Sequence, residues 1–164
     1  MPKIQYMTPH FAVSDALTPD EFPALAALGF KAVVSNLPDG EYAGQLAGKQ
    51  EAALAWRAGL RFRHVPTTKH DVLTDDVIEG MAEALSSLQG PILAHCRSGT
   101  RSAIVWAAAS ARSQPVDCVL ETLAKAGMDF DFLRDDLEAQ ADRRRWVGTH
   151  QALDCDCEKP AAAA

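Results

Sequence analysis

Hydrophobic residues in this chain occur both in short continuous runs and at helical spacings. The short runs end at Gly, Pro, Asn or Asp, which is typical of buried strands. The longer segments repeat apolar residues every three or four positions, as amphipathic helices do. The predicted strands cover residues 11–13, 31–36, 60–65 and 92–94, and the predicted helices cover residues 18–29, 45–58, 74–88, 100–111, 116–126 and 131–146.

This alternation of strands and helices predicts an α/β domain with a mostly parallel central sheet and helices on its faces. In sheets of this kind, functional sites form outside the carboxyl ends of the strands. Cys96 follows one predicted strand, and the loops 37–42 and 66–71 follow two others. We therefore expect these three segments to lie close together.

The size and charge of the chain narrow its class. Its 164 residues and hydrophobic fraction of 48% fit a single catalytic domain, placed at residues 1–150, and residues 151–164 are expected to form a flexible tail. A net charge of −6 argues against partners such as nucleic acid or anionic membranes. The sequence starts without a leader pattern and contains no membrane-spanning apolar segment, so a cytoplasmic location is expected.

The four cysteines are unevenly spaced and do not resemble a disulfide framework. Cys118 falls in a predicted helix, where a cysteine fits as a small core residue. A pair such as Cys155-Asp-Cys157 can bind a metal or relay redox equivalents, but the chain has no second pair of this kind. The sequence therefore predicts neither a metal nor another cofactor.

One segment, Gly90-Pro-Ile-Leu-Ala-His-Cys-Arg-Ser-Gly-Thr-Arg-Ser102, combines the features of a nucleophile and an anion site. It places Cys96 at the end of an apolar strand and Arg101 where the next helix begins. Backbone N–H groups of such a turn stabilise negative charge, first on a thiolate and then on a bound oxyanion. The planar guanidinium of Arg101 can hold two oxygens of an anion. We predict Cys96 as the nucleophile and Arg101 as the anion ligand.

The neighbouring residues are expected to support this pair. Gly99 permits backbone conformations that other residues avoid, and the hydroxyl of Ser102 can donate to the sulfur. His95 should orient the turn from behind, whereas Arg97 should point mainly to solvent or to the rim of the pocket. The predicted anion-binding loop consists of Arg97, Ser98, Gly99, Thr100 and Ser102.

The chain resembles the phosphatase-like domain family of the beta-lactamase hydrolase-like proteins, also described as a sulfur-transferase family. The resemblance covers roughly residues 4–127 and rests on Ala27-Leu-Gly-Phe-Lys-Ala-Val-Val-Ser-Asn36, Pro38-Asp-Gly-Glu41, His64-Val-Pro66, Leu73-Thr-Asp-Asp-Val77 and the Cys96 segment. It implies the fold of protein tyrosine and dual-specificity phosphatases, with Cys96 as nucleophile and Arg101 as anion ligand. This chain has Leu37 where the family usually carries an arginine.

The spacing within the loop departs from the phosphatases of this fold. Only four residues, Arg97 to Thr100, separate Cys96 from Arg101, one fewer than in those phosphatases. The loop is similar to that of single-domain rhodaneses, in which the cysteine carries a persulfide. We therefore favour sulfur transfer through a Cys96 persulfide, from a small-molecule sulfane-sulfur donor to a thiol acceptor.

Two alternatives stay open. The first is a phosphatase that hydrolyses a phosphoester through a phosphocysteine. The resemblance to dual-specificity phosphatases implies a general acid in the loop after the third strand, where Asp71 fits best. Asp75 and Asp76 are better explained as partners of a helix dipole. The second alternative is a non-catalytic module that binds anions or senses redox state. Asp39 lies in the other facing loop, where turn chemistry accounts for it.

Overall fold

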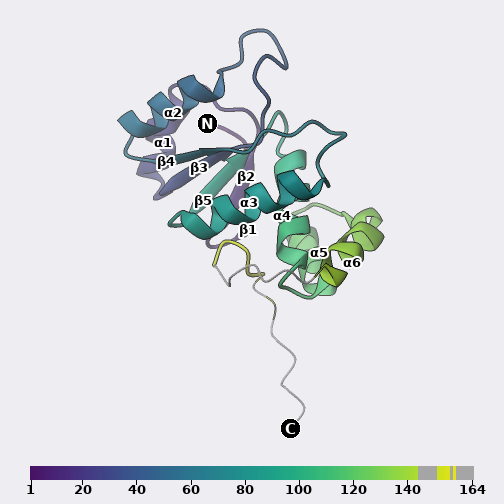
Figure 1. Ribbon diagram of the computed structural model, residues 1–164. Helices are drawn as coiled ribbons and strands as arrows, with labels where there is room; N and C mark the ends of the chain where they lie inside the picture. The colour runs from purple at the N-terminus through teal and green to yellow at the C-terminus, as the bar shows by residue number, and fades with distance from the viewer. Residues whose placement is uncertain (144–150, 156, 158–164) are drawn as a thin grey trace.

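The computed structural model describes residues 1–143, 151–155 and 157, and its centre is a five-stranded sheet with strand order β1-β2-β5-β3-β4 (Figure 1). The strands are β1 (Gln5–Thr8), β2 (Phe11–Ser14), β3 (Ala32–Ser35), β4 (Arg61–His64) and β5 (Ile92–His95). β1 pairs antiparallel with β2, and the other three pairings are parallel. The mostly parallel α/β architecture predicted from the sequence is therefore confirmed.

Six α-helices and one short 3-10 helix are present in the described part of the chain. Their bounds are α1 (Glu21–Ala27), α2 (Gly48–Arg57), α3 (Asp75–Ser87), α4 (Thr100–Ala111), α5 (Val116–Lys125), η1 (Asp131–Leu133) and α6 (Arg134–Asp142). The predicted helix 131–146 thus starts as a 3-10 turn, and residues 144–146 lie outside the described residues. α1 begins three residues later than predicted, because residues 18–21 form a turn in which the Glu21 carboxylate accepts the Thr18 N–H.

Alternating side chains of the strands divide the core into two layers. Ala12, Val33 and Leu93 point into a smaller cluster with residues of α1 and α2. Their neighbours along the strands, such as Val13 and Ala94, point into a larger cluster built by α3, α4, α5 and α6. Successive side chains of a strand point to opposite faces of the sheet, so helices must cover both faces to bury them. Figure 1 shows α1 and α2 on one side of the sheet and α3 and α4 on the other.

The strand β1 was not predicted, because it is a short edge strand with only two of its four residues buried. The C-terminal segment also differs from the expected flexible tail. Ala152 and Leu153 are fully buried in the larger cluster, so this part of the C-terminal segment packs against the domain. Residues 156 and 158–164 of that predicted tail lie outside the described residues. Within the described ranges, no helix is long and apolar enough to cross a membrane.

Candidate active site

Cys96 lies at the carboxyl end of the central strand β5. The preceding residue, His95, is in parallel register with Ser14 of β2 and Ser35 of β3, so the sulfur sits at the sheet edge where three strands end. Every residue of β5 is buried, and Cys96 itself is inaccessible to solvent. Cys96 is also the free cysteine among the described residues. The expected position of Cys96 at this edge is confirmed, and its role as nucleophile stays a prediction.

Gly99 shapes the turn between Cys96 and α4. Its backbone adopts a φ of 88°, in the left-handed region, and its N–H donates to Cys96 Sγ over 3.1 Å. A Cβ on this residue would lie 3.3 Å from the carbonyl oxygen of Ser14. A glycine is therefore needed both for the backbone conformation and for the close approach to β2. The turn directs at least this N–H toward the sulfur, as the sequence predicts.

Arg101 makes a two-pronged ion pair with Glu41. Its Nη1 donates to Glu41 Oε2 over 2.7 Å, and its Nη2 donates to Oε1 over 2.5 Å. Nη1 also donates to the carbonyl oxygen of Thr67 over 2.8 Å. The hydrogen bond to Arg101 lowers the pKa of Glu41, and the same bond is the main cause that raises the pKa of Arg101. Cys96 contributes to the raised pKa of Arg101, so the guanidinium also interacts with the sulfur.

The contacts of Arg101 bring together the Cys96 turn and the loops 37–42 and 66–71, as the sequence predicts. Glu41 belongs to the loop after β3, Thr67 to the loop after β4, and Arg101 to the first turn of α4. Of the five N–H donors of a guanidinium, Glu41 and Thr67 take three, which leaves two for an anion beside Cys96. Two parallel donors are the arrangement that binds two oxygens of a phosphate or a similar oxyanion.

The remaining loop residues separate into exposed and buried groups. Arg97 is exposed and its guanidinium lies 5.1 Å from the ring centre of Tyr42, a cation–π contact at the rim. Ser98 and Thr100 are also exposed, and the Ser98 hydroxyl donates to that of Thr100. Ser102 is fully buried, but its hydroxyl has no hydrogen-bond partner within the described residues. The predicted bond from Ser102 to the sulfur is therefore not formed.

His95 supports the turn from inside the protein. Its Nε2 lies 2.9 Å from Glu51 Oε1 of α2, and both side chains are almost completely buried. The two side chains are thus in close polar contact, although the ring has no well-aligned hydrogen bond within the described part of the chain. His95 directly precedes Cys96 and has Glu51 as its partner, and its role in orienting the turn stays a prediction.

The predicted acid, Asp71, is an exposed residue of the loop after β4. Its carboxylate accepts a hydrogen bond from the Thr68 hydroxyl over 2.8 Å, and its carbonyl oxygen accepts one from the Thr74 hydroxyl. The same loop contacts Arg101 through Thr67, so Asp71 belongs to a segment that borders the anion site. Its role as general acid stays a prediction.

The other acidic candidates have structural contacts. Asp75 lies in the first turn of α3 and pairs with Arg112 and Arg143. Asp39 accepts the N–H of Gly48 over 2.7 Å, so it caps the start of α2. Asp39 thus stabilises the start of α2 in addition to the turn expected from the sequence.

Sequence reasoning placed Glu41 in a loop that faces the site but gave it no role, and it did not single out Glu51. Neither carries a local motif that identifies its partner, because Arg101 is 60 positions from Glu41 in the sequence. One feature of the sequence could have pointed to Glu41: it belongs to the loop 37–42, which was expected at the same sheet edge as Cys96. Leu37, at the position where the family resemblance implies an arginine, is buried, and its carbonyl oxygen contacts His64. It supplies no anion contact.

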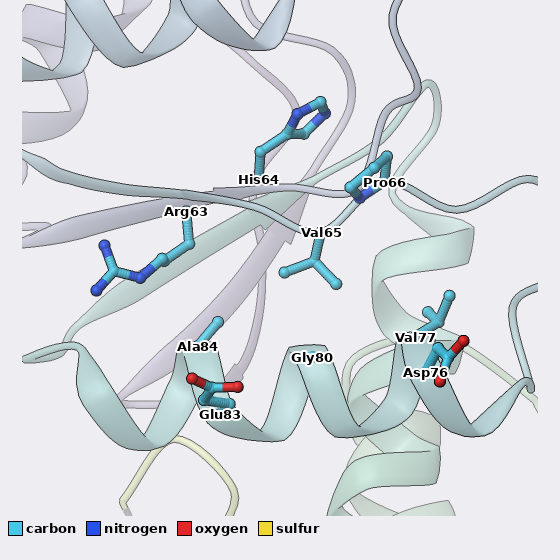
Figure 2. Close-up of a pocket in the computed structure, with 9 residues that line it drawn as sticks. All are labelled: Arg63, His64, Val65, Pro66, Asp76, Val77, Gly80, Glu83 and Ala84. Carbon is cyan, nitrogen blue, oxygen red and sulfur yellow. The ribbon is translucent and has the colours of Figure 1, made fainter.

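A separate groove of about 390 Å³ runs between β4 and α3 (Figure 2). Its walls are formed by Arg63, His64, Val65, Pro66, Asp76, Val77, Gly80, Glu83 and Ala84. None of these residues belongs to the Cys96 turn. The groove adjoins the loop that carries Thr67 and Asp71, but its lining does not include the sulfur or Arg101.

A buried cysteine at the end of a central parallel strand, followed by a turn and an arginine on the next helix, defines a cysteine-dependent enzyme of the phosphatase-like fold. The chain belongs to the family described as beta-lactamase hydrolase-like protein, phosphatase-like domain, whose model matches residues 3–113. The family resemblance drawn from the sequence is thereby confirmed.

Curated relatives and solved structures agree with this assignment. Beta-lactamase hydrolase-like proteins from Agrobacterium fabrum and Xylella fastidiosa are 34% and 33% identical over 52% and 64% of this chain. The matches span only 20% and 24% of those relatives' own lengths. A candidate phosphatase from Neisseria meningitidis is 29% identical, with a TM-score of 0.71 over 84% of this chain and 97% of its own.

More distant structures share the fold. A candidate phosphatase from Shewanella putrefaciens has a TM-score of 0.63 at 16% identity and covers 86% of this chain and 92% of its own. The protein TpbA of P. aeruginosa, solved in complex with phosphotyrosine, has a TM-score of 0.54 at 20% identity, over 86% of this chain and 89% of its own. The phosphatase-like fold expected from the sequence is therefore confirmed.

Proposed function

We propose that this domain hydrolyses a phosphate monoester through a covalent intermediate on Cys96. The observation that carries the proposal is the Arg101 guanidinium, which interacts with Cys96 and keeps two N–H donors free of Glu41 and Thr67. The family assignment and the N. meningitidis structure support the same chemistry. Since a distant relative was solved with phosphotyrosine, an aryl phosphate is the substrate class proposed for this chain.

In the proposed first step, the Cys96 thiolate attacks phosphorus, forming a sulfur–phosphorus bond while the bond to the ester oxygen breaks. The leaving oxygen takes a proton from Asp71. Arg101 holds two of the non-bridging oxygens, and backbone N–H groups of the turn balance the remaining charge. In the second step, Asp71 accepts a proton from water as the water oxygen attacks phosphorus. The sulfur–phosphorus bond then breaks, which releases phosphate and restores the thiolate.

One observation favours a second candidate, the sulfur transfer expected from the sequence. Only four residues separate Cys96 from Arg101, and a shorter turn offers fewer N–H groups to three phosphoryl oxygens. In that reaction the Cys96 thiolate attacks a sulfane sulfur, the donor leaves as an anion, and a thiol acceptor removes the sulfur. This route has little need of Asp71, because its leaving group departs without a proton.

Parallel assays on one purified sample distinguish the two reactions. We expect hydrolysis of p-nitrophenyl phosphate that Cys96→Ser abolishes and Asp71→Asn lowers by roughly 10²- to 10⁴-fold. Rapid quenching should trap one phosphoryl group on the enzyme. If thiosulfate and cyanide are turned over instead, with a thiol-reversible mass increase of one sulfur and no effect of Asp71→Asn, the phosphatase proposal is wrong and sulfur transfer replaces it.

A further inference from the structure

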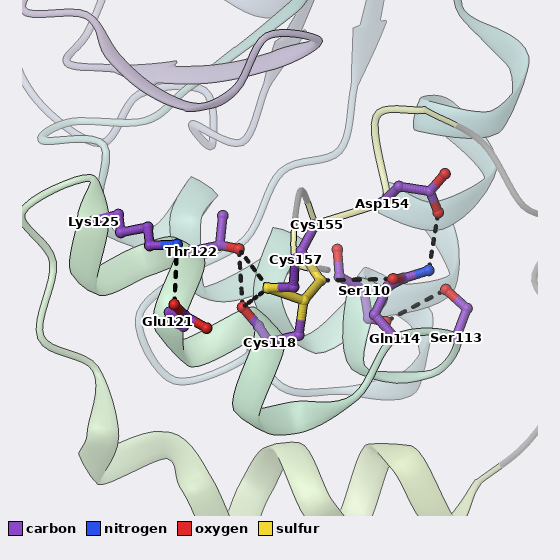
Figure 3. Close-up of a disulfide and its surroundings, with 10 residues drawn as sticks. All are labelled: Ser110, Ser113, Gln114, Cys118, Glu121, Thr122, Lys125, Asp154, Cys155 and Cys157. Atoms are coloured by element: carbon purple, nitrogen blue, oxygen red, sulfur yellow. Dashed lines mark hydrogen bonds and ion pairs between the residues drawn. A yellow bond between two sulfur atoms is a disulfide. The ribbon is translucent and has the colours of Figure 1, made fainter. Parts of the chain in front are cut away.

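Three cysteines gather where the C-terminal segment meets α5 (Figure 3). Cys118 lies in the first turn of α5, and Cys155 and Cys157 belong to the C-terminal segment, almost forty residues later. Their sulfur atoms all lie within 4.8 Å of one another. Cys118 and Cys155 are buried and Cys157 is partly buried. From the sequence, Cys118 was expected to be a core residue, and Cys155 and Cys157 were expected to bind no metal.

Contacts other than those of the sulfurs hold the C-terminal segment in this place. Trp106 of α4 donates its indole N–H to the carbonyl oxygen of Ala152 over 2.7 Å. The side-chain amide of Gln114 donates to Asp154 over 2.9 Å. The buried side chain of Leu153 packs in the larger core cluster. Cys155 and Cys157 are therefore presented to Cys118 by packing and hydrogen bonds.

A disulfide accounts for only two of the three sulfurs. Cys118 Sγ lies at bonding distance from the sulfurs of both Cys155 and Cys157, and a sulfur atom can form one disulfide at a time. Either pairing would leave a third thiol in contact with the bridge. Three mutually close sulfurs on one helix turn and one Cys-x-Cys segment are, by contrast, what a thiolate metal site requires.

We propose that Cys118, Cys155 and Cys157 bind a thiophilic divalent metal ion, with Zn²⁺ as the ion that fits best. Zinc–sulfur bonds of about 2.3 Å at tetrahedral angles place sulfurs about 3.8 Å apart. The three sulfurs lie within 4.8 Å of one another, so a bound ion requires only that Cys118 Sγ move away from the two sulfurs now at bonding distance. Three protein sulfurs leave one position of the tetrahedron, which solvent or a small ligand completes. This proposal is independent of the reaction at Cys96.

The surroundings of the sulfurs suit thiolates. Cys118 lies near the N-terminus of α5, where the helix dipole favours negative charge. The Thr122 hydroxyl lies 3.8 Å from Cys157 Sγ, and the Gln114 side chain lies 3.6 Å from Cys155 Sγ. Polar groups that contact metal-bound ligands orient them. Each thiol that binds the metal releases one proton to solvent, so metal affinity should rise with pH.

The metal would have a structural role. α4 runs from the Cys96 turn to Ala111, which at 1.5 Å per residue is about 18 Å, and α5 begins beyond its far end. Cys118 thus follows the end of α4 that is farther from Cys96, and we assign the cluster no step of the reaction at Cys96. A bound ion would join the C-terminal segment to α5.

Cobalt titration of the full chain tests this site. The protein is purified without chelator, kept reduced with a phosphine, and titrated with Co²⁺ and then Zn²⁺. We expect one equivalent of Co²⁺, a near-ultraviolet sulfur-to-cobalt band with tetrahedral visible bands, and displacement by Zn²⁺. Cys118→Ser, Cys155→Ser and Cys157→Ser should each lose the sulfur-to-cobalt band, whereas Cys96→Ser, which removes a thiol outside the cluster, should keep it.

Further measurements separate loss of a ligand from loss of the fold. Cys157→His offers a nitrogen ligand and should still bind Co²⁺, with a shifted spectrum, and circular dichroism should match the parent protein. A fully reduced protein that takes up no Co²⁺ would overturn the proposal. Co²⁺ binding that survives Cys118→Ser would also overturn the proposal, because the ion would then lie outside the three-cysteine cluster.

Discussion

The imidazole of His95 and the carboxylate of Glu51 lie 2.9 Å apart, and both side chains are almost fully buried. His95 ends the central strand β5 and precedes Cys96 directly, whereas Glu51 projects from α2 on one face of the sheet. α2 is thereby joined to the base of the Cys96 turn. Glu51 acts through His95 and is therefore a positioning residue.

Glu51→Ala should destabilise the domain by about 1–3 kcal/mol, because it leaves the buried imidazole without its polar partner. Glu51→Gln should recover part of that loss, since an amide oxygen can occupy the same place. Urea unfolding measures both free energies. Glu121→Ala, which removes an exposed carboxylate paired with Lys125 on α5, is the matched control and should cost much less. Equal losses in Glu51→Ala and the control would contradict the assigned role.

The Glu41–Arg101 pair should make stability depend on pH. Arg101 lowers the pKa of Glu41 in the folded protein, so the pair stabilises the fold above the ordinary carboxyl pKa of about 4.3. That contribution is lost as the pH falls through the lowered pKa. We expect Glu41→Gln to be less stable than the parent by about 1 kcal/mol at pH 7. Unfolding curves at several pH values should show the difference closing below about pH 4.

The two arginines of the turn should differ in importance. Arg101→Lys should lower kcat/KM by roughly 10²- to 10³-fold, because an ammonium cannot hold two oxygens while it also contacts Glu41 and Thr67. Arg97→Lys should cost far less, since Arg97 is exposed and rests on Tyr42 at the rim. Steady-state kinetics on an aryl phosphate compares the two variants. Similar losses would show that their roles are wrongly assigned.

Gly99→Ala should impair both stability and reactivity. A side chain at this left-handed position costs about 1–2 kcal/mol, and its Cβ would press on the Ser14 carbonyl 3.3 Å away. The displaced turn would no longer aim the Gly99 N–H at Cys96 Sγ. Alkylation of Cys96 by iodoacetamide should therefore slow, in addition to the loss in urea stability. Gly29→Ala, a left-handed position with open space around it, is the control for backbone strain alone.

Glycines, prolines and the spacing of apolar residues were sufficient to predict most helices and strands of the fold. The predicted helix 100–111 has the same first and last residues as α4. Its start could be predicted because Gly99 directly precedes it, and its length follows from the apolar run after Gly99. The position of Cys96 follows from the same local pattern. The parallel sheet then predicts which loops meet there, as the contacts of Arg101 with the loops after β3 and β4 confirm.

The contacts within the site required the three-dimensional structure. Glu41 and Glu51 are ordinary polar residues in their own segments, and only the folded chain brings one to Arg101 and the other to His95. The C-terminal segment was misjudged for a similar reason. Its composition favours a mobile tail, but the pocket that receives Ala152 and Leu153 is built by distant helices.

Trp106 offers an optical readout of that segment. Its ring stacks on Phe11 with centroids 5.5 Å apart and is fully buried, while its indole N–H is bonded to Ala152. Of the other two tryptophans, Trp56 is 80% exposed and Trp146 lies outside the described residues. Release of the C-terminal segment would expose the Trp106 indole to water, so its emission should shift to longer wavelength. With both Trp56→Phe and Trp146→Phe, intrinsic fluorescence should therefore report the surroundings of Trp106 alone, and circular dichroism would separate detachment of this segment from global unfolding.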